Sequence, residues 1–241
     1  MNLLFLDCET TGKETTDRLV ELAYIVKDSK WRYSNKNQRF KPPIPISIWA
    51  MAVTHITNEM VANKHGFKES DIYAPTQNEI WDSVVIAHNI KYDKQILENE
   101  WIKFNKKLIC TMKVANHLYD IESYWLQYLR YYLKLDVDLD ELDLAPHSAM
   151  ADVLVLCKLF TVLVNELEEQ EFCSRDEAID RMIEISSKPI TIRRMNFGKH
   201  KWVEIQKLDK DYVQWLKKNL EKKDNEDLLY TLDLYFSSKL I

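Results

Sequence analysis

Apolar runs separated by polar residues predict a sheet at the start of the chain. Residues 3–8 (LLFLDC) and 19–26 (LVELAYIV) are two such runs, and residues 31–40 are expected to form a third strand. Short runs of this composition are typical of buried strands. The prolines of KPPIPIS, residues 41–47, predict an irregular link, because proline cannot donate a hydrogen bond to a sheet ladder.

Strands and helices then alternate along the chain. SVVIAH (83–88) and LIC (108–110) are short apolar runs typical of buried strands. Helical patterns lie near four ranges, namely 56–64, 92–102, 111–135 and 148–169. Three strands of antiparallel character followed by alternating strands and helices predict an α/β fold, in which a mixed sheet is covered by helices on both faces.

The pattern changes after residue 170. SRDE (174–177) is a capping box that opens a helix, and SSKPITIRRMNFGKHKW (186–202) resembles a small β segment. Two more helical stretches follow, near 212–222 and 226–240. We therefore predict a boundary near 172–187, with one domain over residues 1–172 and a small α+β domain over residues 187–241.

Composition narrows the class of protein. The chain has 241 residues, 46% of them hydrophobic, which favours a folded protein with a substantial core over a disordered one. We find no apolar stretch of membrane-spanning length and no secretion signal. The four cysteines lack the paired spacing of zinc or redox sites. These features predict a reduced, cytoplasmic protein that does not enter a membrane.

Charge is distributed unevenly. The net charge is −5, yet residues 188–223 contain 11 Lys or Arg and four Asp or Glu. This local excess of positive charge is typical of a surface that binds phosphates. A solvated charged face would have the same composition, so charge alone leaves both interpretations open.

Two acids at the end of the first strand suggest a metal site. Asp7 and Glu9 are two residues apart, so their side chains project from the same face of a strand. Neighbouring carboxylates repel each other unless a cation or a shared proton intervenes, and oxygen ligands suit Mg²⁺ or Mn²⁺. The alternative is that both acids lie in water at the strand end and have no function.

Two later motifs supply similar groups. AHNIKYD places Asp93 in the first turns of a helix, and APHSAMAD places His147 just before a helix start and Asp152 one turn inside it. The helix dipole disfavours protonation of His147, which suits a general base. Each motif alone is also typical of an ordinary helix start. Together they could converge at one sheet edge, as two-metal phosphodiester hydrolysis requires, with His147 as the base.

These motifs resemble a known family. DCETTG, AHNIKYD and HSAMAD, in this order, are similar to the three motifs of the DEDDh 3′–5′ exonucleases. The resemblance implies a ribonuclease H-like sheet, two Mg²⁺ or Mn²⁺ ions, and release of nucleoside 5′-monophosphates from a 3′ end. It assigns catalysis to five residues and the metal ions to the four acids among them: Asp7, Glu9, Asp93, His147 and Asp152.

The same resemblance implies contacts with the substrate. Thr10 and Thr11 would lie near the 3′ end, and the segment Thr54, His55 and Ile56 would lie beside the substrate. ISIWAMAVTHITNEMVANK, ICTMKVANHL and FGKHKWVEI further resemble a bacterial exodeoxyribonuclease branch of the family. That branch implies DNA as the partner, as a single strand or a duplex 3′ end, and a C-terminal region that contacts it.

Alternatives remain at this stage. The active-site motifs do not separate DNA from RNA, because that choice depends on contacts near the 2′ position, so an RNA-trimming exonuclease is the alternative enzyme. A non-catalytic nucleic-acid-binding protein is less favoured, because all five motif residues are present. The sequence does not indicate an oligomeric state.

Two positions depart from the family pattern. Lys13 stands where relatives often have an apolar residue that packs against the terminal base. Trp202 replaces a glycine that the resemblance leads us to expect after FGKHK. It could distort a turn or offer an aromatic platform for a base, although core packing is the more frequent use of tryptophan.

Overall fold

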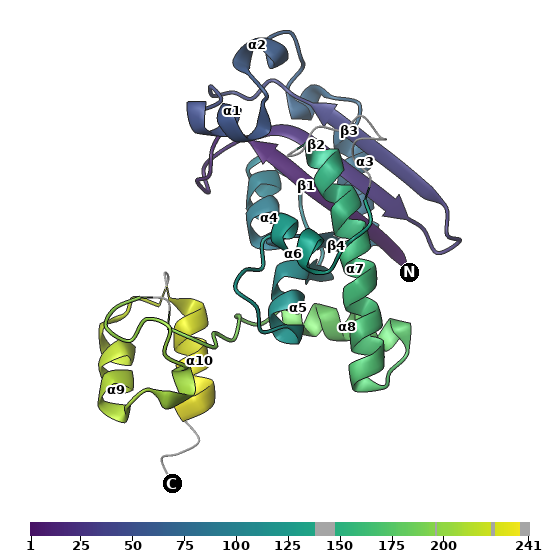
Figure 1. The fold of residues 1–241 in the computed structure, drawn as a ribbon. Coiled ribbons are helices and arrows are strands. Elements are labelled where there is room, and N and C mark those ends of the chain that lie inside the picture. The colour runs from purple at the N-terminus through teal and green to yellow at the C-terminus, as the bar shows by residue number, and fades with distance from the viewer. Residues whose placement is uncertain (138–147, 196, 223–224, 237–241) are drawn as a thin grey trace.

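The computed structural model describes residues 1–137, 148–195, 197–222 and 225–236 (Figure 1). The described residues form a five-stranded sheet in the order β3-β2-β1-β4-β5. The strands are β1 (Asn2–Thr10), β2 (Leu19–Lys27), β3 (Tyr33–Arg39), β4 (Ser83–Ala87) and β5 (Leu108–Cys110). β2 pairs antiparallel with β1 and β3, whereas β4 pairs parallel with β1 and β5. The predicted mixed sheet and its strands are confirmed.

Helices connect and cover the sheet. Those in the described residues are α1 (Ile48–Thr54), α2 (Asn58–Val61), α3 (Tyr73–Asp82), α4 (Ile90–Asn99), α5 (Thr111–Leu118), α6 (Leu126–Tyr132), α7 (Ala149–Glu171), α8 (Arg175–Ser186), α9 (Lys210–Asn219) and α10 (Glu226–Phe236). The sequence patterns did not identify α1 and α3. The predicted capping box is present, because the backbone N–H of Ser174 donates to Glu177 Oε2 at 2.8 Å. None of the described helices is both long and apolar enough to cross a bilayer.

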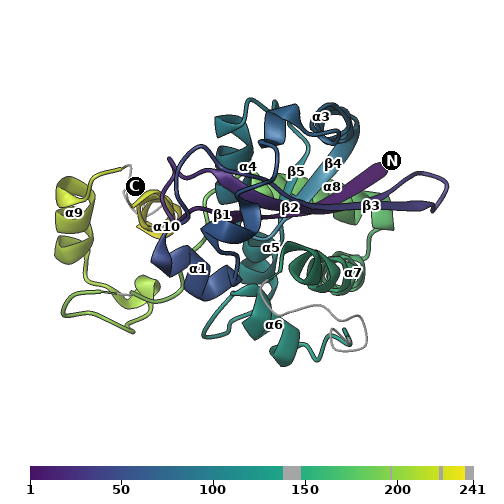
Figure 2. The ribbon, with the colours of Figure 1, turned by 90° about the horizontal axis from the view of Figure 1, so that it is seen from above.

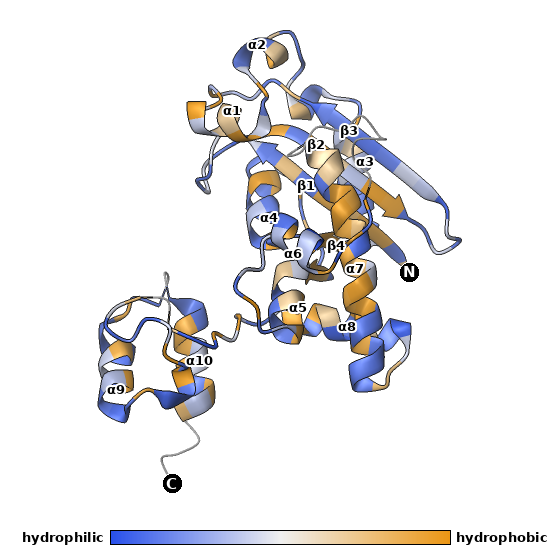
Figure 3. Ribbon diagram, in the orientation of Figure 1, coloured by the Kyte–Doolittle hydropathy of each residue, from blue (hydrophilic) through white to orange (hydrophobic). Residues whose placement is uncertain are grey.

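Alternation along β1 divides the core between the two faces of the sheet. Phe5 packs with α5, α7 and α8, whereas Leu4, Leu6 and Cys8 pack on the face covered by α3 and α4. Figure 2 shows the sheet between these two helical layers. Helix α7 lies across the sheet and packs against β1 and β2. The part of α7 that covers the sheet is largely apolar (Figure 3). Asp7 and Glu9 follow the parity of Phe5 and therefore face α7.

Beyond Phe5, strand β1 pairs with no strand of the described residues on the side of β4. Its parallel pairing with β4 ends at Phe5 and Ile86, whereas its antiparallel pairing with β2 continues and places Glu9 opposite Glu21. The last residues of β1 therefore lie beside the point where the chain leaves β4 and enters α4. A sheet edge of this kind holds side chains from several elements close together.

The predicted β segment at 186–202 is present only in part. Its described residues form one isolated antiparallel bridge, from Arg194 to Glu204, flanked by backbone hydrogen bonds from Met195 N–H to Val203 and from Ile205 N–H to Arg193. At residues 190 and 192 the alternating pattern has another cause, because the backbone N–H groups of Ile190 and Ile192 donate to side chains on α10 (Asp227 Oδ1 at 2.7 Å and Thr231 Oγ1 at 2.9 Å). Side-chain acceptors replace the partner strand that the pattern led us to expect.

Helix α8 and the residues that follow it belong to two different hydrophobic clusters. Helix α8 packs against α5, α7 and β5 and belongs to the sheet's core. The residues after it surround a separate small cluster that includes Met195, Ile205 and Leu216. Arg193 donates hydrogen bonds to the carbonyl of Tyr119 and to Tyr124 Oη, which attaches the C-terminal segment to the loop after α5.

Candidate active site

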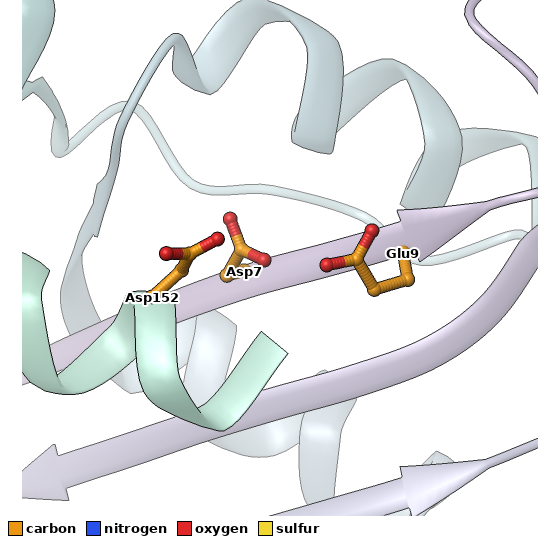
Figure 4. A group of neighbouring side chains, drawn as sticks. All are labelled: Asp7, Glu9 and Asp152. Carbon is orange, nitrogen blue, oxygen red and sulfur yellow. The ribbon is translucent and has the colours of Figure 1, made fainter. Parts of the chain in front are cut away.

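Three carboxylates from two elements meet on the α7 face of the sheet. Oxygens of Asp7, Glu9 and Asp152 all lie within 4.8 Å of one another (Figure 4). Asp7 and Glu9 project from β1, and Asp152 projects from the first turn of α7. That turn is fixed locally, because the Oγ of Ser148 accepts a hydrogen bond from the backbone N–H of Ala151.

The charges in this cluster are unfavourable to one another. Burial raises the pKa of Asp7 well above its ordinary value, and the charges of Asp93 and Glu9 raise it further. Burial, followed by the charge of Asp152, raises the pKa of Glu9 to about 9, and Arg39 only partly opposes this shift. Three oxygen donors that repel one another fit a hard divalent cation such as Mg²⁺ or Mn²⁺. The donor chemistry therefore fits the metal that the family implies.

Asp93 comes to the end of β1 from α4, which covers the other face of the sheet. It lies on α4, is only 4% exposed, and is not one of the three residues of the close cluster. Burial raises its pKa to about 7, while hydrogen bonds from its own backbone and from the backbone and thiol of Cys8 act in the other direction. Its charge is the leading electrostatic influence on Asp7. Asp93 is therefore close enough to Asp7 for its charge to raise the pKa of Asp7, although it lies outside the three-carboxylate group.

The predicted base cannot be placed. His147 lies outside the described residues, so its role stays a prediction. The turn that follows it is described from Ser148 onward and carries Asp152.

Glu21 was not singled out from the sequence and lies directly beside this site. It is 2% exposed and accepts a hydrogen bond from Arg39 Nε at 2.8 Å. Its other oxygen accepts from the backbone N–H of Ala149 at 3.2 Å. Glu21 therefore ties β2 to the first turn of α7, which carries Asp152. The sequence did contain a signal for Glu21, because it is an acid within the apolar run LVELAYIV.

Gln127 is a second residue that sequence reasoning missed. Its Nε2 donates to Asp152 Oδ1 at 2.6 Å from helix α6. The bond orients the Asp152 carboxylate from the α6 side. The sequence contained no signal for this contact, because Gln127 lies in an aromatic-rich helix far from the acidic motifs.

Thr10 and Thr11, the last residue of β1 and the residue after it, make hydrogen bonds inside the protein. Both are buried. The Oγ1 of Thr10 lies 2.8 Å from Tyr92 Oη, and the Oγ1 of Thr11 donates to Asp17 Oδ1 at 2.6 Å. Their hydroxyls hold the turn that follows the strand, so the predicted contacts with a 3′ end stay predictions.

The other predicted substrate segment begins at Thr54, the last residue of α1. Thr54 Oγ1 donates to the carbonyl of Ala50, and Ile56 is buried in a small cluster with Val20. Of the three predicted residues, His55 alone is exposed, with a left-handed φ of 57°. The backbone N–H of Ser47 donates to the carbonyl of Thr11, which places the start of α1 beside the turn after β1. Contact between this segment and a substrate stays a prediction.

The acids and the residues that support them lie in a part of the chain that matches a known protein family. The family model RNase_T, described as exonuclease, matches residues 4–160. The chain belongs to the RNase_T exonuclease family. It is a DnaQ-like 3′–5′ exonuclease by this membership, which confirms the assignment made from DCETTG, AHNIKYD and HSAMAD.

Curated relatives extend the likeness beyond the family model. Exodeoxyribonuclease 10 of Escherichia coli (strain K12) is 28% identical over 243 residues, covering 98% of this chain and 99% of that protein. DNA polymerase III PolC-type of Thermotoga maritima is 27% identical over 174 residues, covering 68% of this chain and 12% of the polymerase. The first likeness includes the segment after α8, which the family model does not reach.

Solved structures agree with the RNase_T fold. Exonuclease X in complex with 5′ overhanging duplex DNA is 25% identical and covers 76% of this chain and 99% of that chain, with a TM-score of 0.60. Escherichia coli exonuclease I in complex with a dT13 oligonucleotide is 19% identical, with a TM-score of 0.55, and covers 71% of this chain and 42% of that chain. The latter likeness concerns the fold alone.

Proposed function

We propose that this RNase_T exonuclease is a metal-dependent 3′–5′ exodeoxyribonuclease that releases nucleoside 5′-monophosphates from DNA. The observation that carries the proposal is the group of three carboxylates within 4.8 Å of one another. DNA as the substrate is supported by the full-length likeness to a protein named exodeoxyribonuclease 10. The substrate would be a single strand or the 3′ end of a duplex.

Four acids would hold the metal: Asp7, Glu9, Asp93 and Asp152. When bound, two Mg²⁺ or Mn²⁺ ions supply an acidified attacking water and positive charge for the leaving oxygen. Burial, and then the neighbouring carboxylates, raise the pKa values of Asp7 and Glu9, and a bound cation would favour the charged form of both. Gln127 fixes the orientation of Asp152, and His147 would take the proton of the attacking water.

The residues after α8 would form a small DNA-contacting domain over residues 187–241. Two features support this proposal: a hydrophobic cluster separate from the sheet's core, and the excess of positive charge between residues 188 and 223. Phosphate contacts from such a surface add affinity without sequence preference.

The decisive experiment compares matched DNA and RNA oligonucleotides, each labelled at the 5′ end. We expect the protein with Mg²⁺ to shorten DNA from its 3′ end faster than RNA, and a chelator to stop the reaction. Asp7→Ala should abolish digestion, whereas Asp71→Ala, which removes an exposed acid elsewhere, should not. Digestion by Asp7→Ala at the wild-type rate would refute the site. Faster digestion of RNA would instead indicate an RNA-trimming exonuclease.

A further inference from the structure

Four aromatic side chains of the C-terminal segment come from one turn and from the helix α9 that follows it. The rings of His200 and Tyr212 have centroids 4.3 Å apart, and Tyr212 and Trp215 are stacked at 5.8 Å with an interplanar angle of 10°. Trp202 lies in the same turn as His200. We call these four residues (His200, Trp202, Tyr212 and Trp215) the aromatic face.

The two tryptophans of this face contribute little to the core. The small cluster of the C-terminal segment is built from buried aliphatic side chains, with Val213 and Leu216 supplied by α9. Trp215 is 54% exposed and Trp202 is 71% exposed. Large rings left in water lose the free energy that their burial would contribute. Core packing, the more frequent use of tryptophan, therefore does not account for either residue.

Trp202 also adopts a backbone conformation that suits glycine. Its φ is 72°, in the left-handed region, and its backbone N–H donates to the carbonyl of Met195 at 2.7 Å. A side chain with a Cβ is strained there, whereas glycine is not. The turn therefore forms as it would with glycine, and the cost of the Trp202 side chain is not recovered by burial. Strain of this kind is typical of functional positions.

Lysines flank the rings. Lys199 Nζ lies 5.4 Å from the centroid of Tyr212, and Lys201 Nζ lies 5.1 Å from that of Trp202. Lys218 follows Trp215 by three residues and so lies on the same side of α9. In the parts of the chain that the structure describes, these three lysines have no acidic partner, whereas the nearby Lys217 pairs with Asp233. Their charge is therefore available to an anion.

We propose that the aromatic face is a platform on which unpaired bases of single-stranded nucleic acid stack, while the flanking lysines contact the phosphates. The proposal deepens the function proposed above and rests on it for the nucleic-acid substrate. The rings of Tyr212 and Trp215 are nearly parallel, so a base can stack on them. Stacking of this kind tolerates any sequence. The unpaired lysines favour a polyanion over an apolar protein partner.

The test measures binding by the full-length protein in a chelator, so that no cleavage occurs. The probe is a fluorescein-labelled oligothymidylate of about 20 nucleotides, longer than a single binding site requires. Trp215→Ala should weaken binding roughly fivefold to 150-fold, the loss expected for one stacked base. Trp215→Phe should retain most of the affinity. The matched control is Trp81→Ala, which removes an exposed tryptophan at the end of α3 and should change nothing.

A second measurement tests the lysines. The logarithm of the association constant falls as the logarithm of the salt concentration rises. Replacing Lys199 and Lys201 by glutamine should make the slope of this dependence shallower, by roughly 0.7 for each lysine that contacts a phosphate of a single strand. Trp215→Ala should leave that slope unchanged, because a ring carries no charge. A slope equal to that of the wild type in the double lysine variant would overturn the phosphate contacts.

The outcomes separate this proposal from the proposed function. Trp215→Ala should keep wild-type turnover of a trinucleotide, which is shorter than a typical single-strand binding site, and lose activity only on long substrates. If the wild type binds DNA without cleaving it and Trp215→Ala still weakens binding, the platform stands and the nuclease function fails. If the wild type cleaves DNA and Trp215→Ala binds it equally well, the platform is refuted. A change in self-association with unchanged DNA binding would also refute it.

Discussion

Without a ligand, the acidic edge of β1 and the aromatic face of the C-terminal segment are both energetically unfavourable, but for opposite reasons. At the edge, charges are drawn out of water and held close together, so that each raises the pKa of its neighbours. On the face, apolar rings are left in water, one of them on a strained backbone. A cation would relieve the first arrangement and a stacked base the second.

The two regions also differ in how they are built. The edge joins residues as distant as Asp7 and Asp152, and it is held within the main core by β1, β2 and α7. The face needs only a turn and one helix, residues 198–218, on a small separate cluster. Because the regions share no described contact, substitutions in one should leave the other intact and their effects should add.

The largest effect is expected from a substitution that disrupts the acidic edge and leaves the aromatic face intact. Asp7→Asn should reduce turnover by about 10³-fold or more, because it removes one ligand and one charge from a site that acts as a unit. Binding of single-stranded oligothymidylate in a chelator should stay at the wild-type level. Parallel kinetic and anisotropy measurements test this, and a loss of binding as large as the loss of turnover would show that the two regions are not separable.

A smaller effect is expected at the residue that supports the edge. Glu21→Ala should reduce Mn²⁺ affinity by roughly 10-fold to 100-fold, the usual cost of losing a partner that orients metal ligands. The reason is that Ala149 and Arg39 lose their shared acceptor. Titration calorimetry measures the affinity. Glu21→Gln, which retains an oxygen acceptor for the Ala149 N–H, should recover part of it, and equal affinities in both variants would remove the positioning role.

The metal-free edge should also make stability depend on pH. Because the folded protein holds the pKa of Glu9 at about 9 and that of Asp93 at about 7, it binds more protons than the unfolded chain above pH 4.5. Stability in a chelator should therefore fall as the pH rises from about 5 to 8, by up to about 1.4 kcal/mol per pH unit for each proton involved. Mg²⁺ should reduce this slope. Thermal unfolding at several pH values measures it, and a rise in stability over this range would contradict the electrostatics.

The smallest effect concerns the strained turn of the face. Trp202→Gly should be about 1 kcal/mol more stable than Trp202→Ala, because glycine adopts a φ of 72° without the cost of a Cβ. Both variants lack the ring and should bind single strands equally weakly. Urea unfolding compares the two. If the alanine variant were the more stable one, the left-handed conformation at residue 202 would not be a cost to the stability of the protein.

Local pattern was a good guide where neighbouring residues decide the structure. The alternation in β1 separates Leu4 and Leu6 from Phe5, Asp7 and Glu9, and both groups lie on the faces it predicts. The pattern failed at residues 190 and 192, where alternation reflects hydrogen bonds to side chains of α10 and not a partner strand. A period of two residues describes an extended chain, but it does not identify the acceptor that satisfies each N–H.

The sequence by itself determined the sheet-forming runs, the acidic motifs and the family. It did so because spacing within a few residues sets which side chains share a face. Only the tertiary structure decided that Glu21 and Gln127 support the Asp152 turn, that Asp93 approaches Asp7 from the Cys8 side, and that Trp202 and Trp215 are left exposed. These facts depend on register, helix docking and cluster size, which arise from contacts between residues tens to more than a hundred positions apart.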